Sequence, residues 1–156
     1  MKPKICSVNL SKSKGTAKTP VESARFIEGY GLKDDAHAGG DAIRQVSLLA
    51  LESIKRQNDC SKIPDGTGEL KPGDFGENIT TFGINLLELK IGDRLKIGGE
   101  VVLEISKIGK ECHRRCAIYY KTGDCVMPRE GIFGKVLEGG VAAVGDQIEV
   151  LGKCLK

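Results

Sequence analysis

Apolar and polar residues alternate with a period of two in residues 85–110, the most regular stretch of the chain. Leu95 and Ile97 alternate with charged residues, and an apolar series at positions 101, 103 and 105 follows the glycines at 98 and 99. Period two places alternate side chains on one face of a strand, and a Gly-Gly pair is typical of a hairpin turn. The stretch therefore predicts three strands, the first over NLLELK, separated by a Gly-Asp turn and the Gly-Gly turn.

Shorter apolar segments predict the other elements. Strands are expected at 4–10, around Phe26 and at 44–49, and a short helix at 51–57, where good helix formers cluster. Two more strands are expected in GIFGKVLEGG and VGDQIEVLG near the C-terminus. Together these elements predict a mainly β protein, built as a β-barrel or a strongly curved sheet with one or two short peripheral helices.

The composition is consistent with this fold in a single domain. A length of 156 residues suits one domain over 1–156, and 21 glycines imply many turns. With no Trp, 4 Phe and 3 Tyr, the core must consist mostly of Ile, Leu and Val. The cationic stretch 11–20 and the Asp-, Gly- and Pro-rich stretch 58–74 predict loops.

Charge and hydropathy argue against two classes of partner. A net charge of +3 is too small to indicate nucleic-acid binding, although it suits a small anionic ligand. No apolar run approaches the roughly 18 residues of a membrane span, and the basic N-terminus lacks the apolar region of a signal peptide. Six cysteines without a secretion signal then indicate reduced thiols and a cytoplasmic protein.

Three of the cysteines lie in one cationic stretch, KECHRRCAIYYKTGDCVMPREGIFG, at 110–134. Cationic neighbours lower the pKa of a thiol, so a reactive or metal-binding thiolate is one interpretation of this stretch. Arg side chains also bind anions. The candidate residues are Cys112 and Cys116, which have C-x3-C spacing, Cys125, and the basic residues His113, Arg114 and Arg115.

Two other interpretations of these cysteines stay open. A structural zinc site usually takes two ligand pairs separated by a loop, whereas here His113 would have to join the adjacent Cys112. Free cysteine also packs as a small hydrophobe, so each thiol of the stretch has an inert alternative. Cys6, Cys60 and Cys154 have no polar neighbours of note in the sequence and are predicted to be structural.

A second polar stretch is KPGDFGENITTFG at 71–83. Its glycines allow backbone amides to form an anion nest, and its amide and hydroxyl side chains can read the edge of a heterocycle. The alternative is a tight turn with Asx bonding ahead of a strand. The candidate ligand-binding residues are Lys71, Gly73, Asp74, Gly76, Glu77, Asn78 and Thr80.

His37 lies in a third polar stretch, DDAHAGGDAIRQ at 34–45, among three aspartates. A histidine beside carboxylates can act as a base or a metal ligand. The alternative is a histidine that only hydrogen-bonds its own loop.

The chain resembles the MOSC domain family, named for the C-terminal domain of molybdenum cofactor sulfurases, and in particular its small stand-alone bacterial members. The resemblance rests on DDAHAG followed by RQVSLL, on PGDFGENITT and IGDRLKIG, which are its most specific parts, and on KECHRRCAI and MPREGIFG. It covers about residues 4–151. It implies a β-barrel-like fold with a few short peripheral helices, and chemistry centred on one cysteine.

The resemblance places the key cysteine in the segment after the IGDRL hairpin. RCAI at 115–118 resembles the step that carries the metal-binding thiol in relatives that reduce N-hydroxylated compounds, and Glu111-Cys112 aligns with a shorter Pro-Cys pattern. Glu replaces Pro in this chain, and the spacing is C-x3-C where those relatives have C-x2-C. Cys116 and Cys112 are therefore both candidate metal ligands, and with Cys125 they are the candidate catalytic thiols.

The function implied by the resemblance is binding of the molybdenum cofactor, molybdopterin, or transport of persulfide sulfur on a reactive cysteine. Molybdenum prefers soft sulfur ligands such as a thiolate. The anionic pterin would suit Arg114, Arg115, Lys71, the glycine-rich loop from Gly73 to Asn78, His113 and His37.

The sequence has no aminotransferase-like or iron–sulfur domain. We therefore expect an accessory or component of a sulfur-transfer system or of a reductase of N-hydroxylated compounds, with a cysteine desulfurase or redox protein as partner. The alternatives are a non-catalytic cofactor-delivery module and a small structural-zinc β protein.

Overall fold

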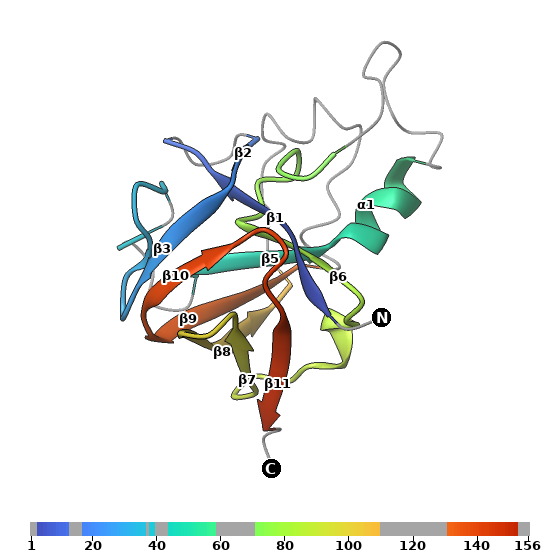
Figure 1. Cartoon of the computed structure of the whole chain (residues 1–156). Helices are drawn as coiled ribbons and strands as arrows, with labels where there is room; N and C mark the ends of the chain where they lie inside the picture. The colour runs from blue at the N-terminus through green and yellow to red at the C-terminus, as the bar shows by residue number, and fades with distance from the viewer. Residues whose placement is uncertain are drawn as a thin grey trace.

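A computed structural model of the chain describes residues 3–12, 17–36, 38–39, 44–58, 71–109 and 131–152. Strands dominate this described part (Figure 1). The strands are β1 (Lys4–Leu10), β2 (Thr19–Val21), β3 (Ser23–Ile27), β4 (Gly31–Leu32), β5 (Val46–Ala50), β6 (Ile79–Phe82), β7 (Arg94–Ile97), β8 (Val101–Ile108), β9 (Ile132–Glu138), β10 (Gly140–Ala143) and β11 (Ile148–Gly152). The helices among the described residues are α1 (Leu51–Asn58) and a 3-10 helix, η1 (Leu86–Glu88).

The strands form two sheets. The larger has the order β11-β7-β8-β9-β5-β6-β1-β2, and the smaller has the order β10-β3-β4. Paired strands run antiparallel except β5 and β6, which run parallel and have α1 between them in the chain. The end of one strand and the start of its parallel neighbour lie at opposite edges of the sheet, so the chain between them must cross over.

The larger sheet curls until its two ends approach each other. The Ile5 N–H donates to Asp146 O and the Gly145 N–H to Ile5 O, each at 2.9 Å, so the entry to β11 lies against the start of β1. Within the described residues, this contact does not continue along β1 as a ladder, and the barrel is therefore not closed. The prediction of a mainly β, strongly curved sheet with short peripheral helices is confirmed.

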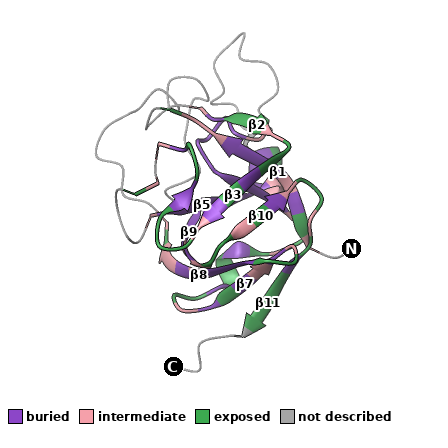
Figure 2. Ribbon diagram, turned by 60° about the vertical axis from the view of Figure 1, so that its left-hand side comes forward, coloured by how far each residue is buried: buried purple, intermediate pink, exposed green. Residues whose placement is uncertain are grey.

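One row of paired residues crosses six strands of the larger sheet. Each member is the Cα partner of the next across the sheet. Their apolar side chains belong mostly to one core cluster, which both sheets contribute to (Figure 2). The row consists of Ile108, Ile132, Leu48, Ile79, Val8 and Val21.

Most predicted elements are confirmed. The strand at 4–10, the strand around Phe26, the helix that begins at residue 51 and the hairpin at 94–108 are all present, and the predicted strand at 44–49 begins two residues later, at Val46. The alternation is also confirmed, since Leu95 and Ile97 are fully buried while Arg94 is exposed.

The predicted strand over NLLELK is wrong, because this segment forms η1. The Asn85 side chain accepts a hydrogen bond from the Leu87 N–H at 3.1 Å and so caps the turn. Leu86 and Leu89 are both buried, and this three-residue spacing matches one turn of a 3-10 helix. The local cap at Asn85 therefore prevailed over an apolar pattern that fits either a strand or a helical turn.

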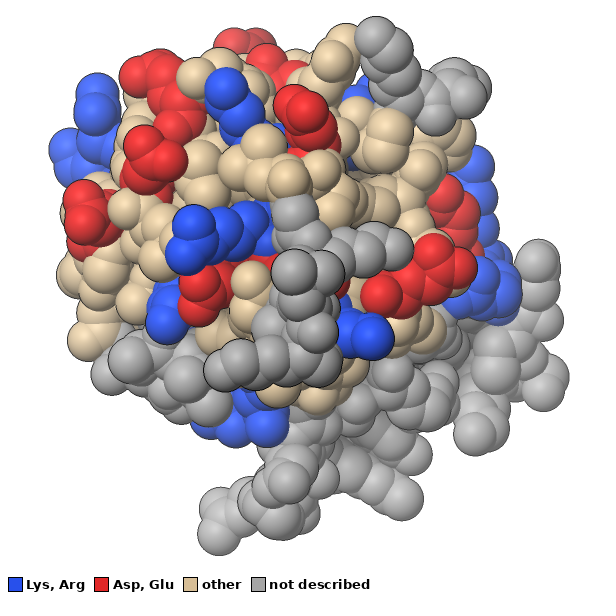
Figure 3. Space-filling model, turned by 90° about the horizontal axis from the view of Figure 1, so that it is seen from below, with Lys and Arg blue, Asp and Glu red and all other residues tan. Residues whose placement is uncertain are grey.

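The exterior is mixed in charge. On the face drawn in Figure 3, lysine and arginine side chains interleave with aspartate and glutamate, in keeping with a net charge of +3. In the part of the chain that the structure describes, no helix is long and apolar enough to span a membrane.

Candidate functional site

The predicted thiols and most of the predicted cationic residues lie outside the described residues. These are Cys112, Cys116, Cys125, His113, Arg114, Arg115 and His37. Their roles therefore stay predictions, and so do the structural roles of Cys60 and Cys154. The structure does describe the chain on both sides of the cysteine-containing segment.

The described residues on either side of the cysteine-containing segment, residues 110–130, lie side by side. The Gly109 N–H donates to Gly131 O at 2.8 Å, and Ile132, the first residue of β9, pairs with Leu48. Leu48 also pairs with Ile79, the first residue of β6, which directly follows the glycine-rich loop. Adjacent strands are roughly 4.8 Å apart, so Ile132 and Ile79 lie about 10 Å from each other. Because β9 runs antiparallel and β6 parallel to β5, Gly131 lies toward the Ala50 end of β5 and the glycine-rich loop toward its Val46 end.

The glycine-rich loop at 71–78 forms consecutive tight turns. The Asp74 N–H donates to Lys71 O at 3.1 Å, and the Asp74 carboxylate accepts from the Lys71 N–H at 2.9 Å. The Gly76 N–H donates to Gly73 O at 3.0 Å. The geometry matches the tight turn with side-chain bonding that the sequence offered as an alternative. The Lys71 side chain is exposed.

The amides of this loop surround a carboxylate of the chain itself. Glu77 is fully buried, and its Oε2 accepts from the Gly73 N–H at 3.0 Å and from the Thr80 hydroxyl at 2.7 Å. Its Oε1 makes no hydrogen bond. Burial raises the pKa of Glu77 to about 7, against the opposing effect of the hydrogen bonds from Gly73 and Thr80 and of nearby backbone amides. Near neutral pH the site therefore holds an exchangeable proton.

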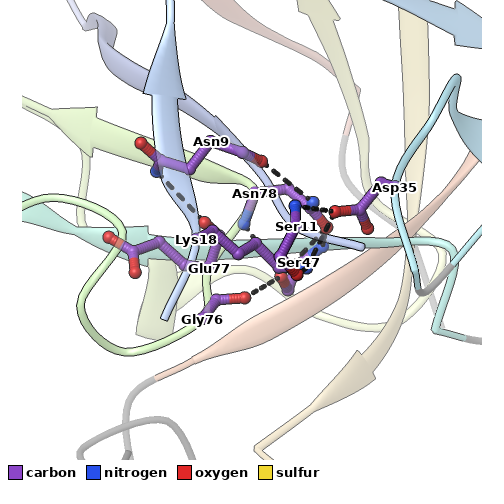
Figure 4. Close-up of polar contacts among 8 residues, drawn as sticks. All are labelled: Asn9, Ser11, Lys18, Asp35, Ser47, Gly76, Glu77 and Asn78. Atoms are coloured by element: carbon purple, nitrogen blue, oxygen red, sulfur yellow. Dashed lines mark hydrogen bonds and ion pairs between the residues drawn. The ribbon is translucent and has the colours of Figure 1, made fainter. Parts of the chain in front are cut away.

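Asn78 joins three strands by its side chain. Its Oδ1 accepts from the Ser47 N–H at 3.0 Å, and its Nδ2 donates to Asn9 O at 3.2 Å (Figure 4). Asn78 is fully buried. Both polar atoms thus serve contacts between β5, β6 and β1, and binding of a heterocycle by this side chain stays a prediction.

Asn9 extends the buried polar network toward β1. Its Nδ2 donates to Glu77 O and to Thr80 Oγ1, both at 3.1 Å, and its Oδ1 accepts from the Ser7 hydroxyl at 2.7 Å. The sequence analysis missed this role, because Ser7 and Asn9 lie within an ordinary predicted strand. Two polar residues on the same side of a strand, at i and i+2, are the signal that was available.

Lys18 is the other residue that the sequence analysis missed. Its Nζ forms an ion pair with Asp35 Oδ1 at 2.8 Å, and the exposed fraction of both side chains is 0%. The same Nζ donates to the Ser11 hydroxyl at 3.1 Å, and the Lys18 backbone N–H donates to Gly73 O at 2.7 Å. Nothing in SKSKGTAK distinguishes this lysine from its neighbours, since its burial depends on residues distant in the chain.

Lys18 brings two of the predicted polar stretches together. Asp35 belongs to the stretch that leads to His37, and Gly73 begins the tight turns of the glycine-rich loop. Figure 4 shows Lys18, Asp35 and Ser11 grouped beside Asn9 and Asn78. The described part of the candidate site is therefore a buried polar cluster that fixes the loops relative to one another.

A cavity lined by described residues lies elsewhere. It has a volume of about 520 Å³ and lies between α1 and the chain from Gly83 to Leu87, with Glu52, Ser53 and Arg56 on the helix side. None of the predicted site residues lines it.

The described residues include no cluster of three or more His, Cys, Asp or Glu side chains that could hold a metal ion. Cys6 is a free, half-buried thiol on β1, and its burial raises its pKa.

The model of the MOSC domain matches residues 34–149. The chain belongs to the MOSC domain family. The match begins at Asp34, in the stretch that Lys18 anchors, and extends past all three thiols of the cationic segment into β11.

Solved structures support the MOSC fold. The YUAD protein from Bacillus subtilis is 20% identical, with a TM-score of 0.76 and coverage of 95% of this chain and 94% of that one. YiiM from Geobacillus stearothermophilus is 20% identical, with a TM-score of 0.71 and coverage of 96% and 75%. YiiM from Escherichia coli is 19% identical, with a TM-score of 0.70 and coverage of 100% and 72%. No curated protein matches the chain. At these identities the structures establish the fold and not the chemistry.

Proposed function

We propose that this MOSC domain binds molybdopterin or carries sulfur on a cysteine of the segment 110–130, as an accessory or component of a sulfur-transfer or N-hydroxylated-compound reductase system. The observation that supports the proposal is the match of the MOSC domain model to residues 34–149, which include the cysteine-containing segment. Ile132 and Ile79, which follow the cysteine-containing segment and the glycine-rich loop, pair with the same residue, Leu48, but the chain reaches it from opposite ends of β5. The register therefore puts the starts of the two strands about 10 Å apart and does not direct the two stretches toward each other.

The described residues suit a supporting role better than direct contact with the cofactor. Gly73, Glu77, Asn78 and Thr80 are engaged with each other and with neighbouring strands, and no cluster among the described residues would hold a metal ion. We therefore assign direct contact to the cationic cysteine segment and to the exposed Lys71, and assign a structural role to the buried residues of the loop. Molybdenum, when bound, would supply a soft Lewis acid for a thiolate ligand.

Within that segment, Cys116 and Cys112 are the preferred thiols, followed by Cys125, and Arg114, Arg115 and His113 are the cations beside them. Adjacent cations stabilise a thiolate, which is the form that ligates a soft metal or accepts a sulfur atom. The same cations suit the phosphate of a pterin cofactor.

The proposal is tested with protein purified from a host that makes the molybdenum cofactor. Bound molybdenum and pterin fluorescence are measured in the wild type and in Cys112→Ser, Cys116→Ser and Cys125→Ser. We expect cofactor in the wild type and its loss in at least one of the three variants. Cys6→Ser is the matched control, because it makes the same chemical change on β1, and it should keep the cofactor.

Sulfur transport has its own measurement. The protein is incubated with a cysteine desulfurase and cysteine, and its intact mass is compared with that of the same Ser variants. A gain of one sulfur atom that disappears with one variant supports a persulfide carrier. Absence of molybdenum, pterin and persulfide together would overturn the proposal, and one zinc per chain with unfolding on chelation would indicate the structural-zinc alternative.

A further inference from the structure

Lys18 contacts two loops by two different groups. Its side-chain Nζ lies 2.8 Å from Asp35 Oδ1 and 3.1 Å from Ser11 Oγ, whereas its backbone N–H donates to Gly73 O at 2.7 Å. Asp35 Oδ1 also accepts from the Ser11 N–H at 3.0 Å, so the carboxylate is held from both sides. The end of β1, the 34–36 turn and the glycine-rich loop thus meet at one residue.

Each charge of the Lys18–Asp35 pair would destabilise the fold if the other were removed. Both side chains are 0% exposed, so water screens neither charge. A buried charge that loses its partner destabilises the fold strongly, whereas an exposed pair contributes little. The Lys18–Asp35 pair therefore strongly disfavours any arrangement in which the 34–36 turn moves away from residue 18.

The contact with the glycine-rich loop is equally specific. A Cβ on Gly73 would lie 2.3 Å from Lys18 O, and the φ of Gly73 is +91°. Only a residue without a side chain permits this approach of two backbones. The loop therefore has one position relative to Lys18 and, through it, relative to Asp35.

We propose that Lys18 is a positioning residue of this MOSC domain. It fixes the position of the 34–36 turn, which precedes His37, relative to the glycine-rich loop. The inference deepens the proposed function, and it rests on that function only where cofactor retention is measured. Lys18 acts through Asp35 and Gly73 and not by contact with a ligand.

Hydrogen exchange tests the positioning role without any cofactor. The proteins compared are the wild type, Lys18→Met, Asp35→Asn and the double variant. In Lys18→Met and in Asp35→Asn we expect exchange to accelerate by about tenfold or more in both 34–36 and 71–78, while the 94–108 hairpin stays protected. The result for Asp35→Asn is decisive, because its effect must reach the glycine-rich loop through Lys18.

Lys135→Met is the matched control. Lys135 Nζ lies 3.3 Å from Glu104 Oε1 in a pair whose side chains are 42% and 22% exposed, and the variant makes the same substitution in a solvated pair. It should leave both loops unchanged. Acceleration confined to the mutated loop, or equal acceleration over the whole chain, would overturn the inference. Should Lys18→Met fail to fold, Ser11→Ala removes the 3.1 Å contact with Lys18 Nζ and must accelerate exchange in the same two segments, though less.

Cofactor retention provides the second measurement. If the wild type binds molybdopterin, Lys18→Met should lose affinity by about tenfold or more relative to Leu95→Ala, a variant that is destabilised at a fully buried position of the core. Equal cofactor retention in the two variants would show that Lys18 contributes only to stability, which would contradict the positioning role. A wild type with neither cofactor nor persulfide would overturn the proposed function alone, and the exchange data would still decide the inference.

Discussion

At the scale of single residues, Glu77 is the most unusual group among the described residues. It is a fully buried carboxyl group in a cage of hydrogen-bond donors, one of whose oxygens has no hydrogen bond. Its pKa of about 7 lies above the ordinary value of 4.5, so the native state binds a proton that the unfolded chain has lost between these two pH values. The contribution of Glu77 to stability is complete below pH 4.5 and is lost as the pH rises through 7.

The first prediction follows from this titration. Between pH 4.5 and 7, the free energy of unfolding of the wild type should fall by about 3 kcal/mol relative to that of Glu77→Gln, whose amide does not titrate. Urea denaturation at several pH values measures the difference. Glu149→Gln, at an exposed position of β11, should keep the wild-type slope. Parallel curves for the wild type and Glu77→Gln would contradict the buried titration.

The second prediction concerns Gly73. Gly73→Ala should lower the free energy of unfolding by about 3 kcal/mol or more, because a Cβ would both overlap Lys18 O and strain a residue with φ of +91°. Gly145→Ala separates the two effects, since its φ is +92° but nothing lies within 4 Å, and it should cost about 1–2 kcal/mol. Gly99→Ala, with open space and no such φ, should change stability by about 0.5 kcal/mol at most. A loss for Gly73→Ala no larger than for Gly145→Ala would show that the loop can move away from Lys18.

At the scale of elements, Asn78 supports the parallel pairing of β5 and β6. Its side chain bonds to the Ser47 N–H and to Asn9 O, and its own N–H donates to Ser47 O at 3.0 Å. The start of β6 is therefore fixed to a strand on each side before the regular ladder begins. The row of paired residues that crosses the larger sheet depends on this register.

The third prediction tests that role. Asn78→Ala should lower the free energy of unfolding by about 2–5 kcal/mol, because it removes the side-chain partners of the Ser47 N–H and of Asn9 O, which are both buried. Asn85→Ala is the matched control, since this exposed asparagine caps η1 within its own segment, and it should cost about 1 kcal/mol or less. Thermal or urea denaturation gives both values. Similar losses for the two variants would show that Asn78 acts only within its own turn.

The elements also show what local patterns can predict. The hairpin at 94–108 and the helix from residue 51 were predictable because alternation, glycine pairs and helix propensity act over a few neighbouring residues. β2 and β4 were not predicted, because strands of three and two residues are too short to show a period. β10 was not predicted, because it pairs with β3, far along the chain. The error at NLLELK came from a cap, Asn85, whose effect the apolar pattern does not report.

At the scale of the whole molecule, the curl of the larger sheet determines which polar residues meet. The curl brings residues 145–148 back to the start of β1, and the parallel pair β5–β6 places the glycine-rich loop beside both β1 and β5. Lys18 then joins this loop to the 34–36 turn. The family resemblance had indicated the important stretches, but it gave no indication that a lysine of the first cationic loop would connect two of them.

By itself, the sequence determined the strand pattern, the main turns, the family and the stretches that carry the candidate chemistry, because each of these depends on short-range periodicity or on a local motif. Only the tertiary structure decided that Lys18 and Asn9 are buried and paired, and that the amides of the glycine-rich loop face Glu77. Burial and pairing are set by segments that lie far apart in the chain and meet only when the sheet curls. The pKa of Glu77 and the ion pair of Lys18 are consequences of that burial and so could not be inferred from sequence spacing.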